Sequence, residues 1–316
     1  MPELALLFPG QGAQCPGMEA GLRDSDPDLL ASHLGRAAAA SRLPLQRLCA
    51  EGPVEQLMRT EVAQPALLAV SLVLADIAHA VGLRPTAFAG HSLGEYTAAV
   101  AAGALTPGDG AALVAERGRL MAHAQRQRPG AMAAILGPTP DTVEALCARA
   151  GHVGVLSIAN FNAPTQTVVS GDDAAIGCLL GLIRELQVGR GVRLPVGAAF
   201  HSSLMRPAQI ELAKTAAALP WRDPGAPLAS NSSGLLVHSA FEVRAALMAQ
   251  ITAPVRWVAC VRTLLASGCR HFLELGPGRA LAGLVRQIAP DSDVAAADSR
   301  AAIEAYVAAR PHLLTT

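Results

Sequence analysis

The sequence of 316 residues has no excess of charge of either sign, because 25 lysines and arginines balance 25 aspartates and glutamates. This balance gives no indication of a nucleic-acid or membrane-surface partner, which would favour a basic patch or run. Lys214 is the only lysine, which we interpret as codon usage. Hydrophobic residues make up 51% of the chain, which is enough for a sizeable core and argues against gross disorder. The length predicts one large domain or two smaller ones.

Cysteine pairs with metal-ligand spacing are also absent from the sequence. The six cysteines are scattered without a C-x-x-C pair, at positions 15, 49, 147, 178, 260 and 269. This spacing argues against a metal site and favours isolated buried thiols in a reducing cytoplasm.

Neither a signal peptide nor a membrane-spanning helix is expected. The N-terminal stretch MPELALLFPGQG has no basic segment, and its apolar run is too short for a signal peptide. The most apolar candidate helix, 66–75, contains Ser71 and is followed by Asp76, whereas a membrane span needs about 20 apolar residues. We therefore expect a globular cytoplasmic protein.

Three short apolar runs predict strands that are buried on both faces, as in a parallel sheet. They are ELALLF (3–8), TAFAG (86–90) and HFLEL (271–275). Glycines and a helical pattern follow these runs, so strands alternate with helices. This alternation predicts an α/β fold with helices on the faces of the sheet.

The middle of the chain has a different order of elements, with four strands and two helices in the order β-α-β-β-α-β. The strands are expected at 130–137, 155–160, 166–171 and 192–196, and the helices at 140–150 and 172–187. This order is that of a ferredoxin-like subdomain. We expect it at 128–197, inserted between residues 1–127 and 198–316 of one large α/β domain.

A nucleophile elbow is predicted around Ser92, in the stretch Gly90-His91-Ser92-Leu93-Gly94. The serine of such an elbow lies on a strained strand-to-helix turn, so the residues on either side must lack bulk. The helix that follows directs its unpaired N–H groups toward a developing oxyanion. The alternative is a glycine-flanked serine that only caps this helix.

A nucleophilic serine needs a base, and His201 is the best candidate among nine histidines. It follows the last strand of the small subdomain, where the chain returns to the large domain and a cleft between the two is expected. Taken alone, His201 fits a polar residue at a helix start equally well. His91 adjoins the serine, but consecutive side chains at a tight turn point apart, so we interpret it as structural.

No acid completes a Ser-His-Asp arrangement. The acids considered between the serine and the histidine resemble helix caps or solvated positions, namely Asp109, Glu116, Asp141, Glu144, Asp172, Asp173 and Glu185. A backbone carbonyl could orient the imidazole instead. The missing acid argues against a hydrolase of the usual kind.

Nine stretches, spread over nearly the whole chain, carry a family resemblance. They are LLFPGQGAQCPGM (6–18), VAQPALLAVSLVL (62–74), GHSLGEYTAAVAAGAL (90–105), VAERGRLM (114–121), GAMAAILG (130–137), IANFNAPTQTVVSG (158–171), AAFHSSLM (198–205), ITAPVRW (251–257) and FLELGPGRALAGL (272–284). In this order they resemble the malonyl-CoA:acyl carrier protein acyltransferases of fatty-acid synthesis and the acyltransferase units of polyketide synthases. The resemblance implies an α/β-hydrolase-like domain with an inserted ferredoxin-like subdomain.

The resemblance also implies the catalytic residues. Ser92 corresponds to the acylated nucleophile and His201 to its base, with the main-chain carbonyl of Gln250 orienting the imidazole. The main-chain N–H groups of Gln11 and Leu93 correspond to the oxyanion hole, in which one donor contributes about 10²- to 10³-fold in rate.

Substrate-binding residues are implied in the same way. Arg117 corresponds to the arginine that binds the free carboxylate of the substrate, through two parallel charge-assisted hydrogen bonds. From composition alone, Arg117 would be a solvated helix residue. Met121, in the same stretch, is assigned to substrate binding, whereas Arg119 is expected at the surface.

Donor choice is expected to depend on Phe200, at the position that contacts the acyl α-carbon. In polyketide acyltransferases a phenylalanine there accompanies malonyl and a serine accompanies methylmalonyl, and Leu93 points the same way. Ala198 departs from the usual malonyl signature, which has histidine at this position. Since one methyl group contributes only about 1–3 kcal/mol to discrimination, methylmalonyl-CoA stays an alternative donor.

The implied activity is ping-pong transfer of a malonyl group from malonyl-CoA, through an acyl-serine, to the phosphopantetheine thiol of an acyl carrier protein. It requires no metal or redox cofactor, and we expect a monomer. GQGAQCPG and GPGRALAG lack the spacing of a dinucleotide-binding fingerprint. The alternatives are a thioesterase or editing hydrolase of carrier-bound acyl groups and, less favoured while Ser92 and His201 are both present, a non-catalytic carrier-binding module.

Overall fold

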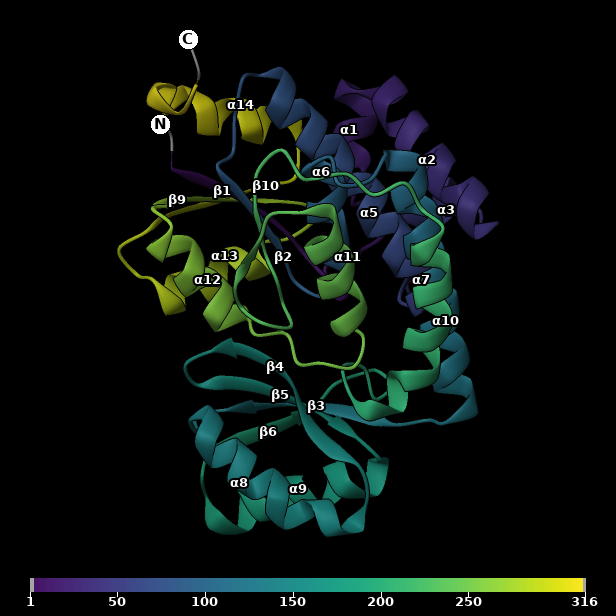
Figure 1. Cartoon of the computed structure of the whole chain (residues 1–316), viewed down its shortest axis with the longest axis vertical. Coiled ribbons are helices and arrows are strands. Elements are labelled where there is room, and N and C mark those ends of the chain that lie inside the picture. Colours follow the sequence, from purple (N-terminus) through teal and green to yellow (C-terminus); the bar gives the residue numbers. More distant parts are fainter. Residues whose placement is uncertain (1–2, 315–316) are drawn as a thin grey trace.

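The computed structural model describes residues 3–314, in which a large α/β part carries a six-stranded sheet (Figure 1). The strand order is β10-β9-β1-β2-β7-β8. The bounds are β1 (Leu4–Phe8), β2 (Ala87–Gly90), β7 (Leu228–Ala229), β8 (Leu236–Val237), β9 (His271–Leu275) and β10 (Asp293–Ala297). All pairs are parallel except β7 with β8, which is antiparallel.

The three strands expected from apolar runs are β1, β2 and β9, and β1 lies between the other two. Every residue of β1 and β2 is buried, as expected for a parallel sheet covered on both faces. The prediction missed β7 and β8, which have two residues each and are too short for a hydrophobic pattern. It also missed β10, an alanine-rich edge strand that is mostly half-buried.

Helices cover the large sheet on both faces (Figure 1). The helices of the large part are α1 (Ala20–Ser25), α2 (Pro27–Ser41), α3 (Leu45–Glu51), α4 (Val54–Leu57), α5 (Thr60–Ala80), α6 (Leu93–Ala101), α7 (Pro107–Gln127), α10 (Arg206–Ala217), α11 (Ala240–Ala249), α12 (Trp257–Ala266), α13 (Ala280–Ile288) and α14 (Arg300–Ala308). The predicted surface loop 220–227 connects α10 to β7.

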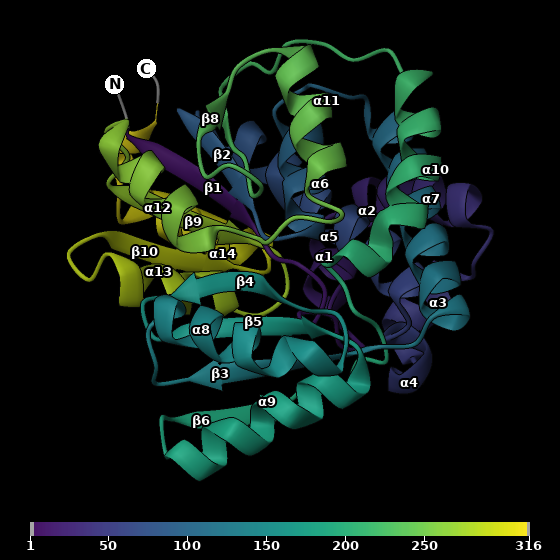
Figure 2. The same ribbon diagram turned by 60° about the horizontal axis from the view of Figure 1, so that its bottom comes forward.

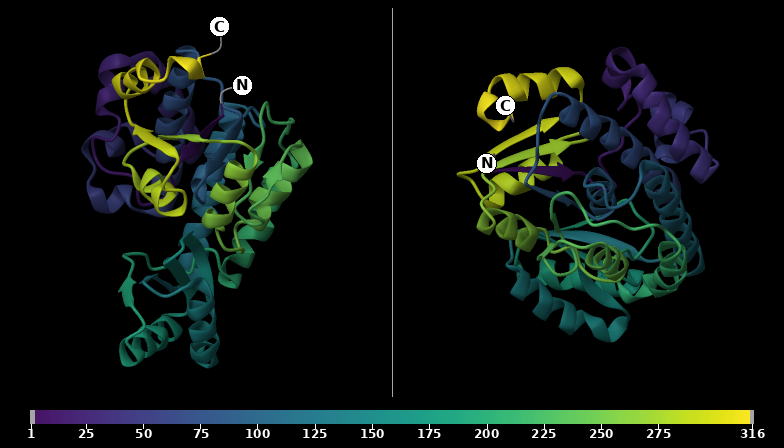
Figure 3. Two further views of the ribbon diagram at one scale, coloured as in Figure 1. Left: turned by 90° about the vertical axis from the view of Figure 1, so that its left-hand side faces the viewer. Right: turned by 45° about the horizontal axis from the view of Figure 1, so that its top comes forward.

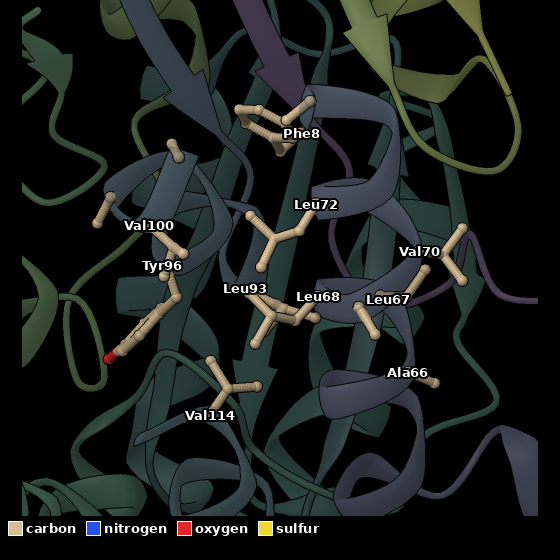
Figure 4. Close-up of a cluster of buried hydrophobic side chains, with 14 of the residues drawn as sticks. Phe8, Ala66, Leu67, Leu68, Val70, Leu72, Leu93, Tyr96, Val100 and Val114 are labelled. Atoms are coloured by element: carbon tan, nitrogen blue, oxygen red, sulfur yellow. The ribbon is translucent and has the colours of Figure 1, made fainter. Parts of the chain in front are cut away.

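Helix α5 is the central helix of the large part. Its 21 residues are long and apolar enough to span a membrane, but 89% of its most apolar window is buried inside the protein. Figure 4 shows Leu68 and Leu72 of this helix beside Leu93 of α6 and Phe8 of β1. We therefore assign α5 to the hydrophobic core.

The small part is a four-stranded antiparallel sheet in the order β4-β5-β3-β6, with α8 (Pro140–Ala150) and α9 (Asp173–Leu186) on one face (Figure 2). Its strands are β3 (Ala131–Leu136), β4 (Leu156–Ala163), β5 (Gln166–Gly171) and β6 (Arg190–Arg193). The strand and helix order is the expected ferredoxin-like one. The limits 128 and 197 of the subdomain stay a prediction.

Strand periodicity gives the small sheet two different faces. In β3, Ala131, Ala133 and Ile135 join the core beneath α8 and α9, whereas Met132 joins the core of the large part. In β5, Val169 joins the core beneath α8 and α9, and Val168 joins the core of the large part. The face without helices is therefore turned toward the large part, from which the small part projects as a separate lobe (Figure 3).

Three details of the small part differ from the prediction. Strand β4 continues to Ala163, beyond the expected end at residue 160, with two irregularities in its pairing, so the turn before β5 is shorter than expected. Strand β6 ends at Arg193, two residues before Pro195, which has no N–H group for a sheet. The apolar spacing within 172–187 predicts one buried helix face that ends at Leu186 or Gln187, whereas the side chain of Leu186 is 41% exposed.

The cysteines agree with the expected isolated thiols at most positions. All six are free; Cys49, Cys147, Cys260 and Cys269 are buried, and Cys178 is half-buried. Cys15 is exposed, so the expectation of burial was wrong there. It lies in the loop after β1, outside any strand or helix.

Candidate active site

The predicted strand–turn–helix around Ser92 is present between β2 and α6. Ser92 has φ 52° and ψ −107°, a sparsely populated conformation for a residue with a side chain. A Cβ atom at Gly90 would overlap the main chain of Gly94, and one at Gly94 would overlap the carbonyl group of Phe8. Both glycines are thus required because the turn packs directly against itself and against β1.

The alternative interpretation of Ser92 as a helix cap is wrong. Ser92 occupies the N-cap position of α6, but its side chain makes no capping hydrogen bond. Its Oγ instead lies 2.7 Å from Nε2 of His201. The hydroxyl is therefore available to a partner outside its own helix.

His201 is held between Ser92 and Gln250. Its Nδ1 lies 2.9 Å from the main-chain carbonyl oxygen of Gln250, which can only accept a hydrogen bond. Nδ1 therefore carries the hydrogen, and Nε2 accepts from the Ser92 hydroxyl. The carbonyl oxygen takes the position that an acid has in a Ser-His-Asp arrangement.

The imidazole of His201 is neutral at physiological pH. The side chain is 4% exposed, and burial together with the nearby Arg117 cation lowers the pKa of His201 to about 3. His201 also has a positive φ of 58°, as Ser92 does. Two strained residues in direct hydrogen-bond contact are typical of a functional site.

Arg117 lies inside the site on α7, so its interpretation as a solvated residue is wrong. It is 1% exposed. Its Nη1 donates to Oε1 of Gln64 at 2.6 Å, and Nη2 donates to Oε1 of Gln250 at 2.9 Å and to Oγ of Ser92 at 3.2 Å. The guanidinium carbon lies 4.8 Å from the ring centre of Tyr96. Arg119 lies at the surface, as expected, and pairs there with Glu116.

One donor of Arg117 has no partner. Among the described residues, nothing accepts a hydrogen bond from its Nε, although this atom is buried. A buried donor without a partner is costly, and a carboxylate oxygen would satisfy it. Nε and Nη2 can together form the planar two-donor arrangement that matches a carboxylate.

A cavity of about 320 Å³ lies between the large part and the small sheet. Six of the predicted residues line it, namely Gln11, Ser92, Arg117, Met121, Phe200 and His201. The small sheet contributes Met132, Asn160, Asn162 and Val168. The other two predicted residues, Leu93 and Gln250, have fully buried side chains, and their expected contributions come from main-chain groups.

The two expected oxyanion donors are free within the described part of the chain. Neither the N–H of Gln11 nor that of Leu93 donates a hydrogen bond there. The side chain of Gln11 is fixed, because its Oε1 accepts from Oγ1 of Thr60 at 2.7 Å. Thr60 in turn accepts from Gln64 at 2.8 Å, which links the loop after β1 to Arg117.

His91 is structural, as expected. Its Nε2 lies 2.8 Å from Oδ1 of Asn162, and its ring packs against Trp257 at 5.7 Å between ring centres. Burial lowers the pKa of His91. The residue therefore joins the elbow to strand β4 of the small sheet.

Three buried polar residues of the site were missed in the sequence. Asn231, after β7, accepts from the N–H of Ser92 and donates to the carbonyl of Gly90, both at 2.8 Å. Gln64 is a polar residue in an apolar stretch, and this position could have indicated a residue of the site. Glu95 directly follows the elbow and is 1% exposed, but its burial has no signature in the sequence.

Comparison with known proteins decides the family. The sequence profile of the family described as "Acyl transferase domain" matches residues 5–301. The chain belongs to this family. It is 36% identical to a malonyl CoA-acyl carrier protein transacylase of Escherichia coli over 289 residues, which cover 91% of this chain and 93% of that protein. The resemblance stated from the motifs is thereby confirmed, and the protein is an acyltransferase.

Solved structures agree with this assignment. A malonyl-CoA:acyl carrier protein transacylase of Xanthomonas oryzae superposes with a TM-score of 0.94 at 39% identity, covering 98% of both chains. A malonyl-transacylase solved in complex with its type II polyketide synthase acyl carrier protein has a TM-score of 0.93 at 33% identity, covering 97% of this chain and 99% of that one. The α/β fold with a second, antiparallel sheet is that of these structures.

Proposed function

We propose that the protein transfers a malonyl group from malonyl-CoA to an acyl carrier protein through an acyl-serine intermediate. The observation that carries the proposal is the position of Ser92 Oγ, within hydrogen-bond distance of both the His201 base and the buried Arg117 guanidinium. A nucleophile beside a cation suits an acyl group that has a second, free carboxylate.

In the first half-reaction, Ser92 Oγ attacks the thioester carbonyl and His201 Nε2 takes the hydroxyl proton. The N–H groups of Gln11 and Leu93 stabilise the oxyanion of the tetrahedral intermediate. The carbon–sulfur bond then breaks, His201 returns the proton to the CoA thiolate, and malonyl-Ser92 remains. The Gln250 carbonyl stabilises the imidazolium while His201 holds the proton.

In the second half-reaction, the phosphopantetheine thiol of the carrier protein attacks malonyl-Ser92. His201 takes the thiol proton and returns it to Oγ as the ester bond breaks. Nε and Nη2 of Arg117 hold the malonyl carboxylate throughout, which keeps the acyl group in place between the two half-reactions.

Donor size is limited by the cavity wall. Phe200 and Met121 from the large part and Met132 from the small sheet line the space beside Ser92. We propose that Phe200 contacts the acyl α-carbon and favours malonyl over methylmalonyl. The name of the polyketide complex above supports a carrier protein as acceptor.

The reaction needs no metal or redox cofactor, because His201 and the oxyanion donors supply its proton transfer and charge stabilisation. We place the reaction in the cytoplasm, in fatty-acid or polyketide synthesis, and propose that the protein works as a monomer. A hydrolase of monocarboxylic acyl groups would have no use for the buried Arg117.

The acyl-serine is tested by incubation with labelled malonyl-CoA and location of the label by peptide mass. We expect one malonyl group on the peptide that contains residues 90–105 and none on a Ser92→Ala variant. Label on another peptide, or label retained by the variant, would contradict the mechanism.

The carboxylate site is tested with Arg117→Ala, with Arg119→Ala on the same helix as the matched control. We expect malonyl transfer to fall about 10²-fold or more in Arg117→Ala, since a charged hydrogen-bonded pair is lost, while acetyl transfer is spared or raised. Equal loss for malonyl and acetyl would mean that Arg117 is structural.

Pathway and donor choice are tested together by competition. Malonyl-CoA and methylmalonyl-CoA are mixed with a fatty-acid carrier protein and a polyketide carrier protein, and the acylated carriers are identified by mass. We expect malonyl on the preferred carrier; methylmalonyl as the main product would contradict the assignment of Phe200.

A further inference from the structure

Glu95 is a buried carboxylate that the mechanism above leaves unused. It lies on the first turn of α6, three residues after Ser92, and is 1% exposed. Its Oε1 accepts from the N–H of Asn231 at 3.1 Å, and its Oε2 accepts from Nε2 of Gln250 at 2.6 Å. Burying a carboxylate is costly unless hydrogen-bond donors compensate it, so the burial of Glu95 beside the site calls for an explanation.

The side chain of Gln250 links this carboxylate to Arg117. Its Nε2 donates to Glu95 and also to the main-chain carbonyl of Ser92 at 2.7 Å. Its Oε1 accepts from Nη2 of Arg117 at 2.9 Å. An amide has one NH₂ group and one oxygen, so acceptors on one side force the oxygen toward the other side.

Glu95, together with the main-chain carbonyl of Ser92, therefore sets which atom Gln250 presents to Arg117. With a carboxylate at position 95, the amide oxygen faces the guanidinium and accepts from it. With a donor at position 95, the amide would turn and present NH₂ to Arg117, which also only donates. Arg117 would then lose one of the two glutamine oxygens that hold it.

We propose that Glu95 is a positioning residue for the donor carboxylate. Through the side-chain amide of Gln250, it holds Arg117 where the guanidinium meets the malonyl group. This inference rests on the proposed function, because it assumes that Arg117 binds that carboxylate. Within the described residues, the Glu95 side chain makes no hydrogen bond to His201 or to Oγ of Ser92; its partners are Asn231 and Gln250.

Glu95→Gln tests the inference in the full-length protein, because it keeps the shape of the side chain and replaces one acceptor oxygen by NH₂. Acylation of Ser92 is measured at pH 8, where Glu95 is ionised, with malonyl-CoA and, separately, with acetyl-CoA, which has no free carboxylate. We expect kcat/KM for malonyl-CoA to fall about 10- to 100-fold, mainly through KM, since a hydrogen bond to a charged group is lost. For acetyl-CoA, we expect a change of less than about threefold. Glu116→Gln on α7 is the control for the loss of an acid.

A double variant, Glu95→Gln with Gln250→Glu, tests the direction of the link. The carboxylate at position 250 would accept from Arg117 and from the new amide at position 95, so the acceptor facing Arg117 returns. The Ser92 carbonyl loses its donor in this variant, which lowers the activity with both donors, so the ratio is the readout. We expect the malonyl-to-acetyl ratio of kcat/KM to recover relative to Glu95→Gln alone. If Glu95 only supported the fold, the malonyl-to-acetyl ratio would not recover in the double variant.

Two results would overturn the inference: an equal fall for both donors in Glu95→Gln, and a malonyl-to-acetyl ratio in the double variant that stays at its Glu95→Gln value. If Glu95→Gln does not fold, Glu95→Asp replaces it, since it keeps the charge but withdraws the acceptor from Gln250 by one methylene group. The same malonyl-selective loss is then expected. Wild-type protein that takes no malonyl at Ser92 would reject the proposed function instead, so the two failures are distinguishable.

Discussion

The large α/β part and the small antiparallel sheet meet at one cavity but contribute different kinds of residue to it. The large part contributes the polar groups Ser92, Arg117 and His201, each held by several hydrogen bonds to other buried groups. The small sheet contributes two apolar wall residues, Met132 and Val168, and two uncharged amides, Asn160 and Asn162. The charged and nucleophilic groups thus come from the large part, whereas both parts contribute to the apolar walls that limit the size of the donor.

The reason lies in the surroundings of each part. The elbow follows a strand that is buried on both faces, and its turn is held by β1, by Asn231 and by Gln250. Such a setting can maintain strained residues and buried charges. In the small sheet only alternate residues face the cavity, so their size can change without disturbing the elbow.

The largest expected contrast is between two glycines, one in each part. Gly94→Ala is expected to lower the free energy of unfolding by about 3 kcal/mol or more, because its Cβ would overlap the carbonyl group of Phe8. Gly177→Ala in α9 is expected to raise it by about 0.5–1 kcal/mol, since nothing lies within 4 Å of its Cβ. Urea unfolding measures both, and equal effects would remove the contrast.

Two asparagines that contact the elbow from opposite parts give the next contrast. Asn231→Ala would leave a main-chain N–H and a carbonyl unpaired in a fully buried place, and we expect a loss of about 2–4 kcal/mol of stability. Asn162→Ala removes a contact to His91 at the half-buried cavity wall, and we expect a loss of about 1 kcal/mol. Thermal unfolding of both variants, with each Tm shift converted into a change in the free energy of unfolding, compares the two losses. A larger loss for Asn162→Ala would contradict this ranking.

The cavity wall of the small sheet should control donor size. Met132→Ala is expected to raise the methylmalonyl-to-malonyl ratio of kcat/KM by up to about tenfold, because space for one methyl group is worth about 1–3 kcal/mol. Met132→Leu, which preserves volume, is the control and should leave the ratio nearly unchanged. Competition between the two CoA donors measures the ratio. A fall in both activities without a change in ratio would show that Met132 only supports the fold.

The smallest expected effect is a pH dependence of stability from Glu95. Burial raises the pKa of Glu95 from its ordinary 4.5 to about 7. Between these values the folded protein holds a proton that the unfolded chain releases, so this stabilisation is present at low pH and is lost as the pH rises through about 7.

The Tm of the wild type minus that of Glu95→Gln should therefore be larger at pH 5 than at pH 8, by about 2–4 °C. Glu144→Gln, at an exposed position of α8 in the small part, controls for the loss of one acid. A difference that grows as the pH rises would have the wrong sign for this assignment.

Much of this molecule was predictable from local patterns. The runs at β1, β2 and β9 are apolar because these strands are buried on both faces, and the order of elements in the small sheet follows from its own periodicities. The two short strands β7 and β8 could not be predicted, since two residues have no period.

Within the site, the sequence alone determined the elbow, because a strained turn packed against β1 admits only glycine at positions 90 and 94. The family motifs brought in His201, Arg117 and Gln250 as expectations. Only the tertiary structure decided that Ser92 Oγ meets His201 and Arg117, whose positions lie 109 and 25 residues away along the chain.

The tertiary structure also decided the charge state of the site. The same glutamate, histidine and arginine in solvent would be ordinary ionised or titrating side chains. Burial changes them: it lowers the pKa of His201, raises that of Glu95, and leaves Arg117 with a donor to satisfy. Burial is a property of the packed fold, and no local pattern around Glu95 carries it.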